Sequence, residues 1–143
     1  MDAEKTLAIR ADANAQIGLG HVMRCLALAQ GLEKRRTKSI FITREYGNKI
    51  KILIQRYKYD VETIPGDCNW ADDLNLTLNI IDRYGAKTVV TDLSHAGTLT
   101  HQSKYSVYLQ GLKDESKFLV TIDDLNEMSF PSDIIINPNY GAE

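Results

Sequence analysis

The sequence has few of the features that mark secreted, metal-stabilised or membrane proteins. It contains only two cysteines, Cys25 and Cys68, which are too few and too far apart to indicate a zinc site or a disulfide framework. Its start lacks a basic flank followed by an apolar run, and no apolar stretch approaches the roughly 20 residues that span a bilayer. We therefore expect a cytoplasmic protein with no signal peptide, no structural metal and no membrane span.

An excess of positive charge is also missing. The 17 lysines and arginines are outnumbered by 19 acidic residues, and the formal net charge is −2. No basic field is available to attract nucleic acid, so a nucleic-acid partner is not expected. The length of 143 residues, with 43% hydrophobic residues, suits one domain with a real core.

Short apolar runs alternate with longer amphipathic segments. Strands are predicted at Thr6–Ala11, Lys38–Thr43, Asp60–Ile64, Lys87–Thr91, Phe118–Ile122 and Asp133–Asn137, and helices at Gly20–Arg36, Asn48–Tyr57, Ala71–Tyr84 and Gln102–Lys113. The third strand alternates like an edge strand, whereas the last three are apolar enough to be buried. This rhythm predicts an α/β fold, a doubly wound and mainly parallel Rossmann-like sheet of about six strands in the order 3-2-1-4-5-6.

Ligands of such a fold bind outside the carboxyl ends of the strands. The polar residues predicted there are Asp12, Asn14, Arg44, Glu45, Asp92, Asp123, Asp124, Asn137 and Asn139. Strand ends are polar in any α/β protein, so each of these residues taken alone is as readily structural as functional. Asp12, Asp92 and Asn137 are retained as candidates for contact with a ligand.

The stretch Gly18-Leu19-Gly20 opens the first predicted helix. Glycines there permit a positive φ and a close approach of a ligand, and the N–H groups of a helix start favour an anion. A plain tight turn explains the glycines equally well. The match to the dinucleotide fingerprint G-x-G-x-x-G is only partial, because Met23 occupies the third glycine position. A nicotinamide cofactor is therefore not expected.

His21 follows this turn directly and falls in the first helical turn. A helix N-terminus disfavours the imidazolium, so a neutral ring is expected, and a neutral imidazole can accept a proton from water. Arg24, three residues later, lies on the same helical face and could orient a carboxylate or phosphate. A purely structural histidine is the alternative, but its position and the glycines favour a general base.

The segment IRADANAQIGLGHVMRCLALAQGL, Ile9–Leu32, resembles the opening of the pseudaminic-acid-pathway UDP-sugar hydrolases and the related spore-coat polysaccharide proteins. Those proteins resemble the N-terminal half of glycosyltransferases with the two-domain GT-B architecture. The resemblance continues in VVTD (Val89–Asp92), TIDD (Thr121–Asp124) and DIIINPNYGAE (Asp133–Glu143), so it spans nearly the whole chain.

The resemblance implies a specific chemistry. The family hydrolyses UDP-2,4-diacetamido-2,4,6-trideoxy-β-L-altropyranose to UDP and the free sugar, with inversion and without metal or cofactor. The histidine of its G-x-G-H motif, which falls on His21, is the base that activates water. By the same resemblance, the matching positions Asp12, Gly18, Gly20 and Arg24 shape the sugar end of the cleft.

Two departures from the family pattern bear on these expectations. The family aspartate matching Asp92 is usually followed by an aromatic residue in a D-x-Y pattern, whereas this chain continues Leu93-Ser94-His95. The missing aromatic residue leaves the identity of the sugar open. His95 could compensate, but an exposed loop histidine is the favoured interpretation of it. The family proteins are about twice as long, and their C-terminal domain supplies most of the contacts to UDP. Residues 1–143 are therefore expected to form the N-terminal domain, which alone should bind and turn over nucleotide sugar poorly.

Two alternatives remain open at this point. In a glycosyltransferase-like protein of polysaccharide synthesis, the same histidine would deprotonate a sugar acceptor instead of water. In a non-catalytic nucleotide-sugar binding module, the histidine would be vestigial.

Overall fold

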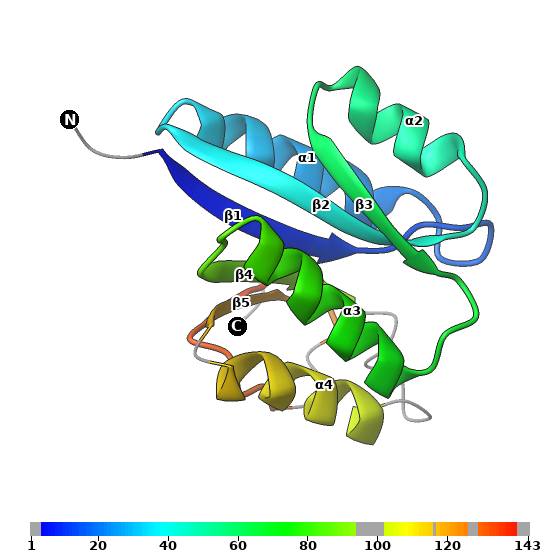
Figure 1. The fold of residues 1–143 in the computed structure, drawn as a ribbon, viewed down its shortest axis with the longest axis vertical. Coiled ribbons are helices and arrows are strands. Elements are labelled where there is room, and N and C mark those ends of the chain that lie inside the picture. Colours follow the sequence, from blue (N-terminus) through cyan, green and yellow to red (C-terminus); the bar gives the residue numbers. More distant parts are fainter. Residues whose placement is uncertain (1–3, 94–101, 116, 126–128, 140–143) are drawn as a thin grey trace.

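The structure, a computed structural model, describes residues 4–93, 102–115, 117–125 and 129–139 as an α/β domain (Figure 1). Its strands are β1 Lys5–Ala11, β2 Thr37–Glu45, β3 Asp60–Pro65, β4 Thr88–Asp92, β5 Phe118–Ile122 and β6 Ile134–Ile136. Its helices are α1 Gly20–Glu33, α2 Lys49–Arg56, α3 Trp70–Arg83 and α4 Gln102–Asp114. No helix in these described parts is long and apolar enough to cross a membrane.

The six strands form one sheet in the order β3-β2-β1-β4-β5-β6, and all five pairings are parallel. The predicted fold class and strand order are therefore confirmed. The chain starts in the middle with β1, winds outward to β3 and then crosses back to β4. That reversal places the carboxyl ends of β1 and β4 side by side, which is the usual position of a ligand site in this fold.

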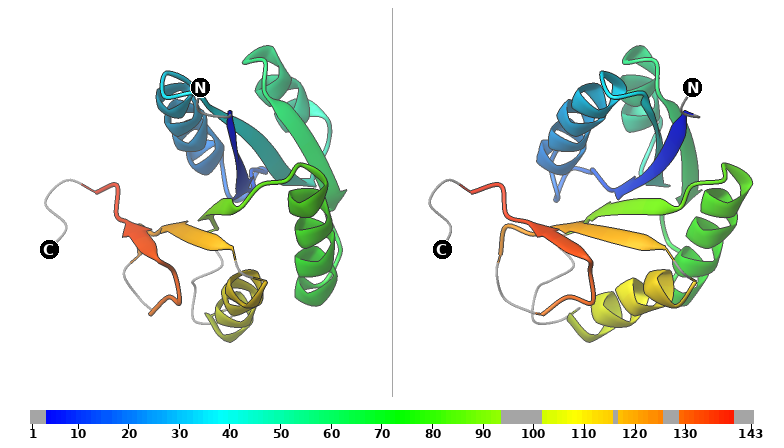
Figure 2. Two further views of the ribbon diagram at one scale, coloured as in Figure 1. Left: turned by 60° about the vertical axis from the view of Figure 1, so that its left-hand side comes forward. Right: turned by 90° about the vertical axis from the view of Figure 1, so that its left-hand side faces the viewer.

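Helices cover both faces of the sheet, as Figure 2 shows. One core layer joins α1 and Ile54 of α2 to apolar side chains such as Ile9 and Phe41 of the sheet. The other layer joins α3 and α4 to the opposite face, where Ile40 and Val89 are completely buried. Because side chains alternate between the two faces of a strand, a central strand buried on both faces reads as a continuous apolar run.

The helix α1 begins at Gly20 as predicted, but its C-terminal end departs slightly from the prediction. The helix ends at Glu33, three residues before the predicted end at Arg36. Arg36 has a φ of +58°, and its N–H donates to the carbonyl of Glu33. A left-handed residue stops a helix, so the basic residues after Glu33 belong to the turn that leads into β2.

The prediction that the last strand is buried is wrong. The side chains of β6 are exposed, at 46% for Ile134, 51% for Ile135 and 38% for Ile136. β6 pairs with β5 and forms an edge of the described sheet, while the main helix contacts of the described residues fall on β1 to β5. An apolar run indicates burial only where layers lie on both sides of the strand.

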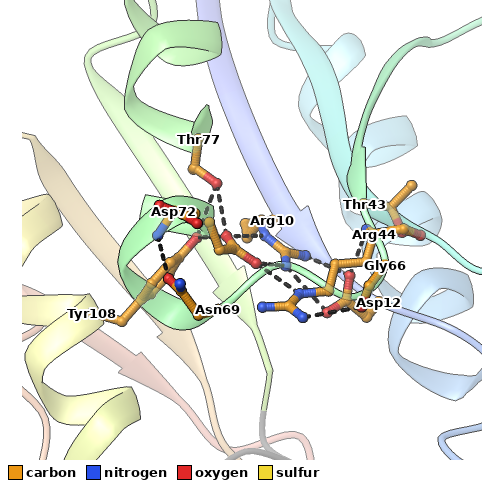
Figure 3. A network of polar contacts seen from close by, with 10 residues as sticks. Arg10, Asp12, Thr43, Arg44, Gly66, Asn69, Asp72, Thr77 and Tyr108 are labelled. Atoms are coloured by element: carbon orange, nitrogen blue, oxygen red, sulfur yellow. Dashed lines mark hydrogen bonds and ion pairs between the residues drawn. The ribbon is translucent and has the colours of Figure 1, made fainter. Parts of the chain in front are cut away.

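A buried network of charges holds β1, β2, α3 and α4 together near the carboxyl edge (Figure 3). Arg10 of β1 is completely buried and shares its guanidinium between Asp12, at 2.5 Å, and Asp73 of α3, at 2.7 Å. Arg44 of β2 donates from Nε to the same Asp73 carboxylate at 2.8 Å. Tyr108 of α4 donates its hydroxyl to Asp73 at 2.9 Å. Two cations and two anions therefore balance in the interior.

Burial by itself raises the pKa of the Asp73 carboxyl, but its neighbours outweigh burial. The charge of Arg10 and hydrogen bonds from Arg10, Tyr108 and Arg44 hold the pKa of Asp73 below its usual value. Thr77, one turn further along α3, adds a hydroxyl hydrogen bond of 3.0 Å. Asp73 thus stays ionised inside the domain because every lone pair has a donor.

Replacing Asp73 by asparagine should destabilise the domain strongly. The substitution removes the anion that Arg10 and Arg44 share and leaves excess positive charge in the interior. We expect the free energy of unfolding to fall by about 3–5 kcal/mol, measured by urea denaturation. The exposed neighbour Asp72 is the matched control, and Asp72→Asn should cost less than about 1 kcal/mol. Equal losses in the two variants would contradict this account.

The Asp73 contribution should also depend on pH with a definite sign. A carboxyl with a lowered folded-state pKa stabilises the protein fully above its unfolded pKa of about 3.9. The stability is lost as the pH falls through the lower folded-state pKa. The difference in unfolding free energy between the wild type and Asp73→Asn should therefore narrow below about pH 4.

Candidate functional site

The loop between β1 and α1 is closed by its own hydrogen bonds. The Oδ1 atom of Asn14 accepts the N–H groups of Gln16, at 2.9 Å, and Ile17, at 2.7 Å. The N–H of Gly18 donates to the carbonyl of Asn14 at 2.8 Å, and Gly18 has a φ of +79°. A glycine is required there because the left-handed conformation is costly for other residues. The loop delivers the chain to the start of α1 at Gly20.

The backbone conformation requires a glycine at position 18 but not at Gly20. Its φ is not in the left-handed region, and a Cβ added at Gly20 would meet no atom within 4 Å. The fold therefore leaves open space over Gly20, at the carboxyl edge of the sheet and beside the first turn of α1. Such space lets a ligand approach the backbone closely.

His21 is held by the carboxylate that ends β4. Its Nδ1 atom lies 2.7 Å from Oδ1 of Asp92, whose side chain is completely buried, whereas 14% of the His21 side chain is exposed. In the neutral tautomer that carries its proton on Nδ1, the ring donates to Asp92 and has its lone pair on Nε2. Nη2 of Arg24 also lies 3.0 Å from the same Nδ1 atom, so Asp92 and Arg24 together fix the orientation of the ring.

Arg24 binds the same carboxylate with two nitrogens. Its Nε donates to Oδ2 of Asp92 and its Nη2 donates to Oδ1, so the guanidinium and His21 converge on one buried anion. A further nitrogen, Nη1, donates to Asp124 after β5 at 3.0 Å. Residues i and i+3 share one face of a helix, so the sequence spacing of His21 and Arg24 aims both side chains at the end of β4.

The two carboxylates of the His21–Arg24–Asp92–Asp124 cluster stabilise the positive charge of Arg24. Hydrogen bonding to Asp92, with a further contribution from Asp124, raises the pKa of Arg24 despite partial burial, so Arg24 stays cationic. Cys25 lies beneath, with its Sγ 3.5 Å from Oδ2 of Asp92. Burial first, and then the Asp92 charge, raise the pKa of the Cys25 thiol, so it stays protonated. Cys25 is a small, completely buried side chain.

Within the parts of the chain that the structure describes, no three histidine, cysteine or acidic side chains gather in a way that could hold a metal ion. What the cluster provides is an imidazole fixed by a carboxylate, with a neighbouring guanidinium that balances the carboxylate charge. That arrangement is suited to proton transfer by the imidazole.

Comparison with solved structures identifies the type of fold. A glycosyltransferase from Rickettsia africae ESF-5 superposes with a TM-score of 0.59 at 15% identity, covering 83% of this chain and 29% of that one. LpCGTa, solved in complex with UDP, superposes with a TM-score of 0.54 at 13% identity, covering 85% of this chain and 30% of that one. This is a glycosyltransferase-type fold. No protein-family profile matches the sequence, and no curated protein does.

The domain described here spans less than a third of either of those chains. The described sheet of this chain is Rossmann-like, with β1 beside β4. At these levels of identity the likeness concerns the fold alone.

The structure separates the predicted site residues into groups. The structure brings His21, Arg24 and Asp92 together, with Gly18 and Gly20 in the turn that precedes them. Asp12 has a different setting, because it is buried in the network of Arg10 with only 4% of its side chain exposed, and its carboxylate also accepts the N–H of Arg44 at 2.8 Å.

Asn137 lies outside this group. It is exposed just after β6, and its Oδ1 accepts the N–H of Asn139 at 3.0 Å. Asn139 rather than Asn137 reaches the end of β5, where its side-chain amide donates to the carbonyl of Asp124 at 3.1 Å. His95, the proposed substitute for the missing aromatic residue, lies outside the described residues.

Two features were not recognised in the sequence as part of a site. Asp124 was one of many polar strand-end residues, and nothing in its spacing identified Arg24 as its partner. The Arg10 network did carry a signal, because an arginine inside the apolar run of Thr6–Ala11 must be paired if both faces of that strand are buried. The partner Asp73 lies 63 residues away, so only the fold reveals it.

The two glycines of the turn should respond differently to alanine. Gly18→Ala forces a side chain into the left-handed region, and we expect the free energy of unfolding to fall by about 1–2 kcal/mol. Gly20→Ala meets open space and an ordinary φ, so its effect should stay within about 0.5 kcal/mol. Chemical denaturation of the two variants measures this contrast, and a larger loss for Gly20→Ala would refute it.

Proposed function

We propose that this domain is the sugar-binding, base-bearing half of an inverting, metal-independent nucleotide-sugar hydrolase. The substrate class proposed is a UDP-linked deoxy-diacetamido sugar used for surface polysaccharide or glycan synthesis. The observation that carries the proposal is the pairing of His21 Nδ1 with the buried Asp92 carboxylate at 2.7 Å, next to the open glycine turn. The resemblance of Ile9–Leu32 to the UDP-sugar hydrolases and the glycosyltransferase-type fold support it.

The proposed reaction starts with a water molecule beside Nε2 of His21. Nε2 accepts a proton from the water as its oxygen attacks the anomeric carbon of the sugar. The bond between that carbon and the UDP oxygen breaks, and its electron pair leaves with UDP. The imidazolium that forms is stabilised by Asp92, which accepts the Nδ1–H hydrogen bond throughout.

Arg24 acts on this reaction through Asp92. Its two hydrogen bonds fix the carboxylate plane, and its positive charge balances an anion that would be costly to bury alone. Because Asp92 is completely buried and already accepts from His21 and Arg24, we assign it a positioning role rather than direct contact with the sugar. Gly20 and the start of α1 form the wall that the sugar would approach.

The nucleotide is proposed to be held mainly by a second domain. The described residues correspond to less than a third of the similar glycosyltransferase-type chains, one of which was solved with UDP. In the absence of such a domain, we expect the chain to bind UDP-sugars weakly and to turn them over poorly.

A transferase is the second candidate, because the similar solved structure from Rickettsia africae is a glycosyltransferase. In that reaction a sugar hydroxyl replaces water, and His21 removes its proton in the same way. The two readings differ in one measurable respect: a transferase releases UDP from the donor only when an acceptor is added.

Replacing His21 by alanine should abolish the base. In the complete protein we expect turnover of the UDP-sugar to fall by about a hundredfold or more, with its dissociation constant nearly unchanged. Gln30→Ala, an exposed position further along α1, is the control and should keep full turnover. Unchanged turnover in His21→Ala would show that His21 is not the base and would favour a non-catalytic binding module.

Replacing Asp92 by asparagine separates positioning from substrate binding. If Asp92 sets the His21 tautomer, kcat should fall by about a hundredfold or more while KM changes little, and the pH profile of kcat should shift. Asp124→Asn, which changes the outer partner of Arg24 and leaves Asp92 in place, is the control and should have a much smaller effect. A large rise in KM with kcat retained would instead place Asp92 in contact with the sugar.

A further inference from the structure

A second concave site lies on the other side of the loop that carries the glycine turn. A groove of about 820 Å³ runs between residues of the β1–α1 loop and the segment from the end of β2 through α2, which lie near each other in Figure 1. The loop contributes Asn14 and Leu19, and the facing wall contributes Tyr46 and α2. His21 points the other way, toward Asp92 at the end of β4. The groove is therefore separate from the His21 cluster but shares the wall at Leu19.

One stripe of α2 faces this groove. Lys49, Ile52, Leu53 and Arg56 all line it, and their spacing of i, i+3, i+4 and i+7 is that of one helix face. The opposite face packs on the core through the completely buried Ile54. The stripe therefore has an apolar centre and a cation at each end, about 10 Å apart along the helix axis.

The charges of the groove have one sign. None of the described residues that line it is acidic, and within the described parts of the chain neither Lys49 nor Arg56 forms an ion pair. Lys49 is also the first residue of α2, which has no acidic residue in its first turn and no side-chain cap from Asn48. A cation at a helix N-terminus opposes the helix dipole. The positive potential at this end of the groove is therefore not offset locally, and a bound anion would offset it.

Tyr46 supplies a fixed aromatic surface in the same groove. A Cβ at Gly66 would lie 3.2 Å from the Tyr46 ring and 2.3 Å from the carbonyl of Glu45, so the ring packs closely over that glycine. The side chain nevertheless remains 42% exposed, and the next residue, Gly47, has a φ of +101° that turns the chain toward α2. An exposed ring held in this way offers a flat apolar face with a polar hydroxyl at its edge.

We propose that this groove binds an anionic carbohydrate, a sugar that carries a phosphate or a carboxylate. The ring of such a sugar fits an aromatic face and the apolar centre of α2, and its anionic group pairs with Lys49 or Arg56. The volume is that of a small-molecule site. This binding does not depend on the hydrolase reaction, and it supplies a place for an acceptor if the transferase reading holds.

The test is a titration of the isotopically labelled chain followed by the amide resonances of α2. Glucose 1-phosphate and glucuronic acid are the anionic probes, with glucose and inorganic phosphate as the comparison ligands. We expect the anionic sugars to bind about tenfold or more tightly than glucose, and the tighter of the two identifies the preferred anion. Binding of inorganic phosphate should be weaker than that of glucose 1-phosphate, because phosphate does not reach the Tyr46 ring.

The variant Lys49→Gln combined with Arg56→Gln should weaken binding of the anionic sugars by about tenfold. Lys51→Gln, which removes the same charge from α2 outside the groove, should change it less than twofold. Thermal melting checks that these surface variants stay folded, and UDP-sugar turnover in the complete protein is scored separately. The proposal is overturned by any of three results: no saturating shift in α2, equal binding of glucose or phosphate, or equal losses in Lys51→Gln.

Discussion

The Asp92 carboxylate is the constraint on which the arrangement of the carboxyl edge depends. A fully buried anion is costly unless charged donors surround it, and here Arg24 supplies two donors while His21 supplies a third atom within hydrogen-bond distance. Both partners lie on one face of α1. Their hydrogen bonds to Asp92 therefore fix the position of the first turns of α1 relative to the end of β4. Asp124 extends the same contact to the end of β5. The need to compensate one charge thus joins three elements that carry the proposed site.

The same edge is reinforced on the opposite face of the sheet by the Arg10 network. Asp73 in that network resembles Asp92 beside α1, since both are completely buried carboxylates that bind guanidinium groups. The two systems differ in access to solvent. Arg10 and Asp73 are sealed inside, which suits a role in stability, whereas His21 and Arg24 retain exposed surface at the mouth. This difference in exposure is the physical ground for assigning chemistry to one system and support to the other.

The glycosyltransferase-type fold and the groove beside α2 place two kinds of concave surface on either side of one short loop. Gly18 shapes that loop and Leu19 forms the wall between them. In the two proposals made above, His21 acts on one side of this loop and the basic, partly aromatic groove binds its ligand on the other. The hydrolase and transferase readings share the same base and differ in what occupies the space around it.

Much of the fold followed from the sequence, because local patterns determine local structure. Alternating apolar and amphipathic segments predicted every strand and helix of the described chain. This rhythm fits a doubly wound Rossmann-like sheet, and that fold class supplied the correct strand order. The position of His21 at a helix start could likewise be derived, since glycine turns and helical spacing are local properties. What the sequence could not determine were contacts between distant residues. The pairing of His21 with Asp92, 71 positions away, and the burial of Arg10 on Asp73 exist only once the sheet is assembled. Exposure of β6 was decided in the same way, because burial depends on which layers cover a strand and not on its own residues.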